Sequence, residues 1–169
     1  MSDIASRFAK LMRHIEIPYP WDRDIFVDAV AQYRGRPILL HPVDDPETLS
    51  GVGCGTTISG LWIKTTDSDI VMYSADTEWH ADHVIAHEIG HMLLGHDEPD
   101  GIPADRLSLY SLMPALSADA IHNVLGRNDY SSEREISAET FADMLMVEAT
   151  LPRRRPSVTR RIFFRARHR

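Results

Sequence analysis

The segment HVIAHEIGHMLL, residues 83–94, decides how this chain is interpreted. No proline interrupts it, and its apolar residues recur at the three- and four-residue spacing of an α-helix. Side chains four residues apart share a helix face, so His87 and His91 can point their imidazoles at one metal ion. Glu88 follows the first histidine, where its carboxylate can take a proton from a water at the metal. This HExxH pattern on a helix predicts a catalytic site for one Zn²⁺ ion.

A catalytic zinc ion usually has three protein ligands and an open fourth position, so one more ligand is needed. Asp97 occupies the place where the long motif HExxHxxGxxH has its third histidine, and His96 lies one residue from it. That motif requires a glycine at position 94 to turn the chain back. Here the residue is Leu94, and Gly95 comes one residue late. Both nearby candidates therefore fit the spacing poorly.

A later helix, expected over residues 135–149, offers a better third ligand. Glu135, Ala138 and Ala142 share one of its faces. The carboxylate of Glu135 could complete a His₂Glu site, because the two small alanines would let this helix approach the zinc helix closely. An acidic face that only contacts solvent would not explain why the acids alternate with alanines.

The register of that ligand depends on one helical turn. If Glu135 binds the metal, Glu139 could accept the free imidazole N–H of a ligand histidine and so orient the ring. A shift by one turn would make Glu139 the ligand and Asp143 the supporting acid. The spacing alone leaves both registers open.

Short apolar segments before the zinc helix predict a small sheet. Strands are expected at 36–43, 57–65 and 69–73, and the turn at 66–68 indicates a hairpin. The fold class that follows is α+β. It consists of a small antiparallel three-stranded sheet packed on helices, in a single domain over residues 1–151.

The strand ending at Tyr73 directly precedes the zinc helix. We expect its edge to hold an extended peptide substrate by β-strand addition. His80 and His83 lie on the first turns of the zinc helix and could line the cleft. We expect them instead to be exposed polar positions.

Peptide hydrolysis also needs a donor that stabilises the oxyanion. Tyr73 and Tyr130 are the candidates, together with Tyr110 and His122. Nothing in the sequence separates them.

The remaining helices are expected at 4–15, 23–33 and 117–125. The first shows an amphipathic pattern. In the second, Asp22 is a suitable N-cap and Gly35 a suitable terminator.

Composition indicates an ordinary globular chain, with 43% hydrophobic and 25% charged residues. The apolar residues near the N-terminus are interleaved with charges, unlike those of a signal peptide. No apolar run is long enough to span a bilayer, so a membrane partner is not expected. A single cysteine, Cys54, excludes an internal disulfide, which favours a cytoplasmic location.

Residues 152–169 form an arginine-rich tail outside the predicted domain. They contain eight arginines and no acidic residue, so the net charge of −7 leaves residues 1–151 at −15. Such a tail could be a solvated arm, could fold back onto the acidic body, or could contact nucleic acid. Nucleic-acid binding is the weaker interpretation, because Phe163 and Phe164 suit packing against protein equally well.

Four segments together resemble the ImmA/IrrE family of metallopeptidases. They are LWI at 61–63, DIVMY at 69–73, AHEIGHMLLGH at 86–96 and EISAETFA at 135–142. The resemblance covers roughly residues 20–150 and includes the zinc motif and the later glutamate motif in order.

This resemblance implies a minimal zincin-like domain of the gluzincin type, with the HExxH helix, a later glutamate helix and Glu135 as the third zinc ligand. It also implies a bacterial or phage cytoplasmic protein, often paired with a helix-turn-helix repressor that it cleaves or inactivates. Two features depart from the family. Ser137 stands where the family often has a second glutamate, and the arginine-rich tail has no counterpart.

The predicted function is therefore a zinc-dependent endopeptidase that cuts a regulatory protein, either a helix-turn-helix repressor or an antitoxin. The alternative is a zinc-containing binding module without turnover, which sequesters a transcription factor or forms one half of a toxin–antitoxin pair. The intact Glu88 favours the enzyme, because a binding module needs no general base.

Overall fold

The computed structural model describes residues 2–45, 49, 59–96, 121–125 and 132–152. The helices are α1 (Ser2–Leu11), α2 (Arg23–Arg34), α4 (Glu78–Leu94) and α6 (Ser132–Thr150). The strands are β1 (Ile38–Pro42), β2 (Gly60–Thr65), β3 (Asp69–Tyr73) and β4 (Ile121–Leu125). None of the helices in these ranges is long and apolar enough to cross a bilayer.

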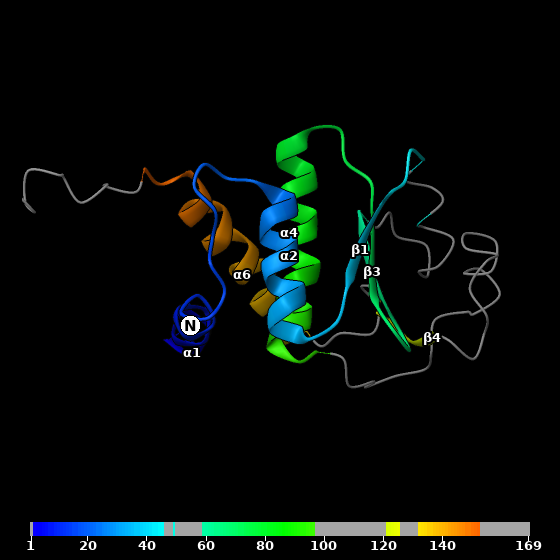
Figure 1. The fold of residues 1–169 in the computed structure, drawn as a ribbon, viewed down its shortest axis with the longest axis horizontal. Coiled ribbons are helices and arrows are strands. Elements are labelled where there is room, and N and C mark those ends of the chain that lie inside the picture. Colours follow the sequence, from blue (N-terminus) through cyan, green and yellow to red (C-terminus); the bar gives the residue numbers. More distant parts are fainter. Residues whose placement is uncertain (1, 46–48, 50–58, 97–120, 126–131, 153–169) are drawn as a thin grey trace, which may run out of the picture.

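The fold is α+β, with a mixed sheet covered on one side by helices. Within the described ranges the sheet has four strands, in the order β1-β3-β2-β4. Strand β2 is antiparallel to both β3 and β4, whereas β1 is parallel to β3. Figure 1 shows α2 and α4 beside the sheet, with α1 and α6 on the far side of α4.

The expected three-stranded antiparallel sheet was wrong in two respects, because the described sheet has a fourth strand and its strands are not all antiparallel. The β2–β3 hairpin forms as predicted, with Ser68 and Thr65 closing its turn through a 2.9 Å backbone hydrogen bond. Strand β1, however, pairs with the far side of β3 and runs parallel to it. The connection from β1 to β2 is long enough to bypass a strand, and alternation within a strand does not reveal its neighbour.

The segment at 121–125 is a strand, although a helix was predicted over 117–125. It pairs with β2, and Val124 lies opposite Ile63. A short apolar run fits a helix or a buried strand equally well, so the partner decides between them. Residues 117–120 lie outside the described part of the chain.

This topology also overturns the expected substrate edge. Strand β3 lies inside the sheet, between β1 and β2, so its backbone groups already have partners. Among the described residues, the outer edges of the sheet belong to β1 and β4.

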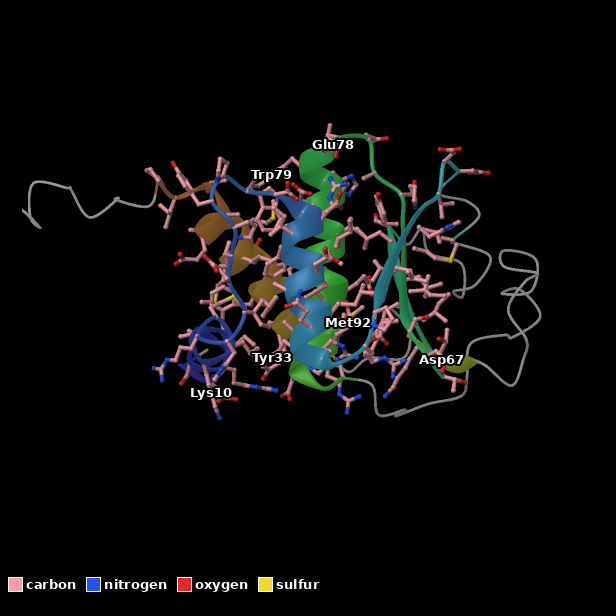
Figure 2. The ribbon with its side chains drawn as sticks, in the orientation of Figure 1. Lys10, Tyr33, Asp67, Glu78, Trp79 and Met92 are labelled. Atoms are coloured by element: carbon pink, nitrogen blue, oxygen red, sulfur yellow. The ribbon has the colours of Figure 1, made fainter. Side chains whose placement is uncertain are left out.

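The zinc-motif helix α4 is the central helix of the domain. Figure 2 marks Glu78 and Trp79 at one end of it and Met92 near the other. Eleven of its residues are buried, from Ala81 to Leu94, because α6 covers one side and the sheet another. A helix that is apolar nearly all round belongs in such a position.

Helices α4 and α6 approach closely where both carry small residues. A Cβ on Gly90 would lie 3.1 Å from the carbonyl oxygen of Ala138 and 3.3 Å from the Cβ of Phe141. Ala138 and Ala142 are both fully buried. The structure therefore confirms that the small alanines let the two helices approach closely at this crossing.

Two arginines fix the C-terminal end of α4. Arg34 donates to the carbonyl of Met92 at 2.9 Å, and Arg7 donates to that of Leu94 at 2.8 Å. Cations at a helix C-terminus complement its dipole and satisfy its last carbonyls. The end of α4 that carries His91 is therefore held from two sides.

Arg34 is itself held by a fully buried carboxylate, that of Asp69. It donates to this group through Nε at 3.1 Å and Nη2 at 2.7 Å, and Trp62 Nε1 donates to it at 3.0 Å. Arg36 Nε lies 3.2 Å from the same group. This network joins α2, the sheet and the end of α4.

Helix α2 agrees with the prediction from its flanking residues. Asp22 caps it by accepting a hydrogen bond from the Ile25 amide, and Gly35 ends it in the left-handed conformation at φ 71°. Helix α1 was predicted to run to Ile15 but ends at Leu11. The turn that follows is bonded more tightly, with His14 donating to Leu11 at 2.9 Å.

Candidate metal centre

Three side chains from two helices converge at the crossing of α4 and α6. The Nε2 atoms of His87 and His91 lie 3.0 Å apart. Glu135 Oε2 lies 3.6 Å from His87 Nε2, and Glu135 Oε1 lies 3.5 Å from His91 Nε2. These ligand atoms fit within 4.8 Å of one another, so the group could hold a metal ion.

The other nitrogen of His87 faces a second acid on α6. Its Nδ1 lies 3.0 Å from Glu139 Oε2. If Nε2 binds a metal, Nδ1 carries the hydrogen and donates it to this carboxylate. A carboxylate in that position orients the ring and makes the histidine a stronger ligand.

His91 finds its corresponding partner just past the end of its own helix. Gly95 takes the left-handed conformation at φ 74°, and the His96 amide donates back to the His91 carbonyl at 3.0 Å. This terminating turn places His96 Nδ1 3.0 Å from His91 Nδ1. The motif spacing predicted His96 only as a poorly placed ligand. The signal for its actual position is Gly95, the glycine that ends the helix.

Electrostatics distinguish the two ligand histidines. Burial lowers the pKa of His87, but the carboxylates of Glu135, Glu88 and Glu139 outweigh it and leave that pKa raised. Burial lowers the pKa of His91 to about 2, helped by the charge of His87. The carboxylates therefore stabilise positive charge at His87, whereas His91 stays neutral and can bind a metal ion.

The residues present fit a metal ion. Glu135 Oε1 is buried and has no hydrogen-bond partner among the described residues. A buried carboxylate oxygen left in this state is costly unless a cation or donor satisfies it. Two imidazole nitrogens facing each other likewise need a proton or an ion between them. One divalent ion would satisfy all three atoms, and a set of two nitrogens and one carboxylate is typical of zinc.

Glu88 lies beside these ligands and is buried, with 6% of its surface exposed. Its charge contributes to the raised pKa of His87. Strand β2 passes so close that a Cβ on Gly60 would lie 2.6 Å from Glu88 Oε1 and 2.7 Å from Val84 Cγ1. The absence of a side chain at Gly60 therefore leaves the space that this carboxylate occupies.

The structure favours one of the two registers left open by the spacing. Glu135 faces both imidazoles, Glu139 lies behind His87, and Asp143 is a further turn away beside His83. Asp97 lies outside the described residues.

Of the four oxyanion candidates, the described side chains include only Tyr73. Tyr73 is half-buried at the end of β3 and lies opposite Gly60 in the sheet. Tyr110 and Tyr130 lie outside the described residues, and the side chain of His122 does too. Tyr73 is therefore the candidate that can be located.

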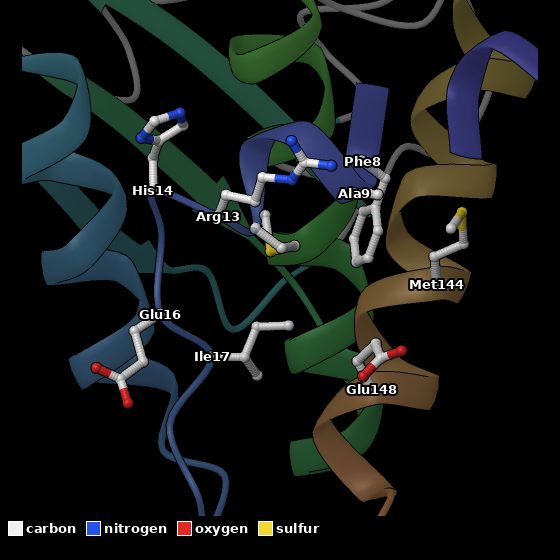
Figure 3. A pocket seen from close by; sticks show the side chains of 9 residues that line it. Phe8, Ala9, Arg13, His14, Glu16, Ile17, Met144 and Glu148 are labelled. Carbon is white, nitrogen blue, oxygen red and sulfur yellow. The ribbon is translucent and has the colours of Figure 1, made fainter. Parts of the chain in front are cut away.

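A separate hollow lies between α1 and α6 (Figure 3). It has a volume of about 800 Å³, with Phe8, Ile17 and Met144 among its apolar lining. Glu16 and Glu148 add acidic groups. It includes none of the three converging ligands, so it is not part of the metal centre.

No model of a known protein family matches the chain, and no curated protein or solved structure matches it either.

Proposed function

We propose that this chain is a zinc-dependent endopeptidase of the ImmA/IrrE type. The observation that carries the proposal is the convergence of His87, His91 and Glu135 at one point, with the buried carboxylate of Glu88 beside them. A purely structural metal site is usually closed by a fourth protein ligand and needs no adjacent base.

The residues of the chain have separate tasks in this reaction. A bound zinc ion supplies Lewis-acid polarisation of the peptide carbonyl and lowers the pKa of a water toward neutrality. Glu88 takes the proton from the attacking water and delivers it to the leaving amide nitrogen. Glu139 keeps the ring of His87 in place by accepting its Nδ1 hydrogen.

An extended peptide would be held at the outer edge of β4. Among the described residues, no strand pairs with this edge. Strand β4 neighbours β2, and its Leu125 lies opposite Trp62. Trp62 is two residues from Gly60, where an added Cβ would meet the carboxylate of Glu88. A peptide that adds to this edge reaches the end of the sheet nearest Glu88.

The proposed substrate is a helix-turn-helix regulator in the same cell, as the family resemblance implies. The acidic body of the chain, at −15 over residues 1–151, complements the basic surfaces of DNA-binding proteins. The cytoplasm, where such a substrate occurs, is the proposed location.

The test compares the wild-type protein with Glu88→Gln, since glutamine keeps the shape of the side chain but cannot accept the proton. Both proteins, loaded with zinc, are incubated with the soluble proteins of the native host, and new N-termini are identified by mass spectrometry. We expect termini that appear only with the wild type, while both proteins hold equal zinc. Identical sets of termini contradict the peptidase and favour the binding module.

A further inference from the structure

The interface between helices α4 and α6 contains further side chains that can bind a metal ion, in addition to the three of the metal centre. Helix α4 presents His83, four residues before His87, and α6 presents Glu139 and Asp143, four and eight residues after Glu135. Because α4 and α6 run in opposite directions, the two rows of side chains face each other turn by turn.

The turn next to the metal centre brings three of these ligands together. His83 Nε2 lies 3.3 Å from Asp143 Oδ1 and 3.7 Å from Glu139 Oε1. One ligand atom from each of the three residues lies within 4.8 Å of the others. We propose that His83, Glu139 and Asp143 form a second site, which binds a divalent transition-metal ion.

The chemistry of the ligands selects the ion. An imidazole nitrogen with two carboxylates suits Zn²⁺, Co²⁺, Ni²⁺ or Mn²⁺, whereas Mg²⁺ and Ca²⁺ prefer oxygen ligands alone. With a neutral ring, the group carries two negative charges and so attracts a dication. Each ligand sits on a regular helix, which holds the spacing without a loop rearrangement.

The two sites differ in exposure. The side chains of Glu139 and Asp143 are 52% and 68% exposed, whereas that of Glu135 is 25% exposed. Water can complete the coordination at the outer site and can also compete there. The outer ion is therefore the weaker and more easily exchanged of the two.

Glu139 couples the two sites. Its Oε2 lies 3.0 Å from His87 Nδ1, and its Oε1 faces His83. An ion on this carboxylate withdraws negative charge from the hydrogen bond that makes His87 a strong ligand. Such supporting contacts change metal affinity by about 10–100-fold. Filling the outer site therefore weakens binding of the inner ion. If the chain is the peptidase proposed above, excess metal inhibits it.

The first experiment measures zinc stoichiometry of the full chain by equilibrium dialysis against buffered free Zn²⁺. The wild type is expected to take up one ion tightly and a second at higher free zinc. His83→Gln and Asp143→Asn should lose only the second ion. His80→Gln, on the same helix, and Glu148→Gln, an exposed acid of α6, are matched controls that should bind as the wild type does.

A single ion in the wild type, or an unchanged second ion in Asp143→Asn, overturns the proposal. Because both replaced residues are partly or largely exposed, the variants should fold, and circular dichroism checks this. The readout is zinc alone, so it remains valid if the peptidase proposal fails.

The second experiment measures the coupling. Protein preloaded with one equivalent of isotopically labelled zinc is diluted into excess unlabelled zinc, and loss of label is followed. Release should be about tenfold faster from the wild type than from Asp143→Asn. Equal rates overturn the coupling between the sites.

Discussion

His87 Nδ1 on α4 lies 3.0 Å from Glu139 Oε2 on α6, so the ring of one proposed ligand is fixed by the helix that carries another. This contact makes metal affinity depend on the packing of the two helices as well as on the ligands. It also makes Glu139 a hydrogen-bond acceptor for His87 rather than the third ligand of the metal centre. The spacing of the acids in the sequence had left both roles open.

Replacing Glu139 with Gln should weaken binding of the tight zinc ion by about 10–100-fold without abolishing it. The amide oxygen can still accept a hydrogen bond but no longer supplies a charge. Competition with a chromogenic chelator measures the affinity. Glu148→Gln is the matched control, and an affinity in Glu139→Gln equal to that of the control would count against the supporting role.

Gly60→Ala should slow cleavage while leaving zinc content near the wild-type level. The new Cβ would lie 2.6 Å from Glu88 Oε1, so the carboxylate has to move, whereas no proposed ligand lies among the nearest contacts. Zinc content and the rate of substrate cleavage are measured on the same sample. Ser59→Ala, the neighbouring position, serves as control; a cleavage rate in Gly60→Ala equal to that of this control would show that the close approach is unimportant.

The metal-free protein should lose stability as the pH falls from about 6.5 toward 4. The pKa of His91 is lowered to about 2 and that of His96 to about 4, both from 6.5. Above pH 6.5 neither the folded nor the unfolded chain protonates these rings, so their contribution is fully present. Below it, only the unfolded chain takes up the protons, and each ring lowers the free energy of unfolding by roughly 1.4 kcal/mol per pH unit.

The raised pKa of His87 acts in the opposite sense, because the folded chain gains that proton first. Its contribution is complete once the pH lies below its unfolded value, so the slope at lower pH belongs to the other two rings. Urea unfolding in the presence of a chelator measures it. His96→Gln should remove about half of the slope between pH 5.5 and 4.5, and an unchanged slope would exclude this source.

Asp69→Ala should destabilise the fold by about 3–5 kcal/mol, because it leaves Arg34 and Arg36 without their buried carboxylate. Chemical denaturation measures the loss. Asp67→Ala, an exposed acid in the preceding turn, should stay within about 0.5 kcal/mol of the wild type. Similar values for the two variants would mean that the network does not hold the domain together.

Features that depend on neighbouring residues could be predicted from the sequence. Asp22 and Gly35 mark the ends of α2 because each acts on the adjacent backbone. The pairing of β2 with β3 likewise follows from a three-residue turn. The spacing of His87 and His91 needs only a regular helix.

Features that depend on residues far apart in the sequence could not be predicted from it. The strand at 121–125 exists because β2 offers an edge, and β1 is parallel to β3 because its connection bypasses a neighbour. The choice between Glu135 and Glu139 depends on how α6 slides along α4. That position is fixed where Gly90 meets Ala138, and no local pattern reports it.

A comparison of Glu135→Ala with Glu139→Ala decides whether Glu135 completes a zinc site with His87 and His91. Each protein is loaded with zinc, dialysed against a chelator that strips weak sites, and analysed for metal. We predict that Glu135→Ala loses the tight ion, whereas Glu139→Ala keeps it with reduced affinity. Retention of the tight ion by Glu135→Ala together with its loss from Glu139→Ala would contradict this assignment and make Glu139 the third ligand.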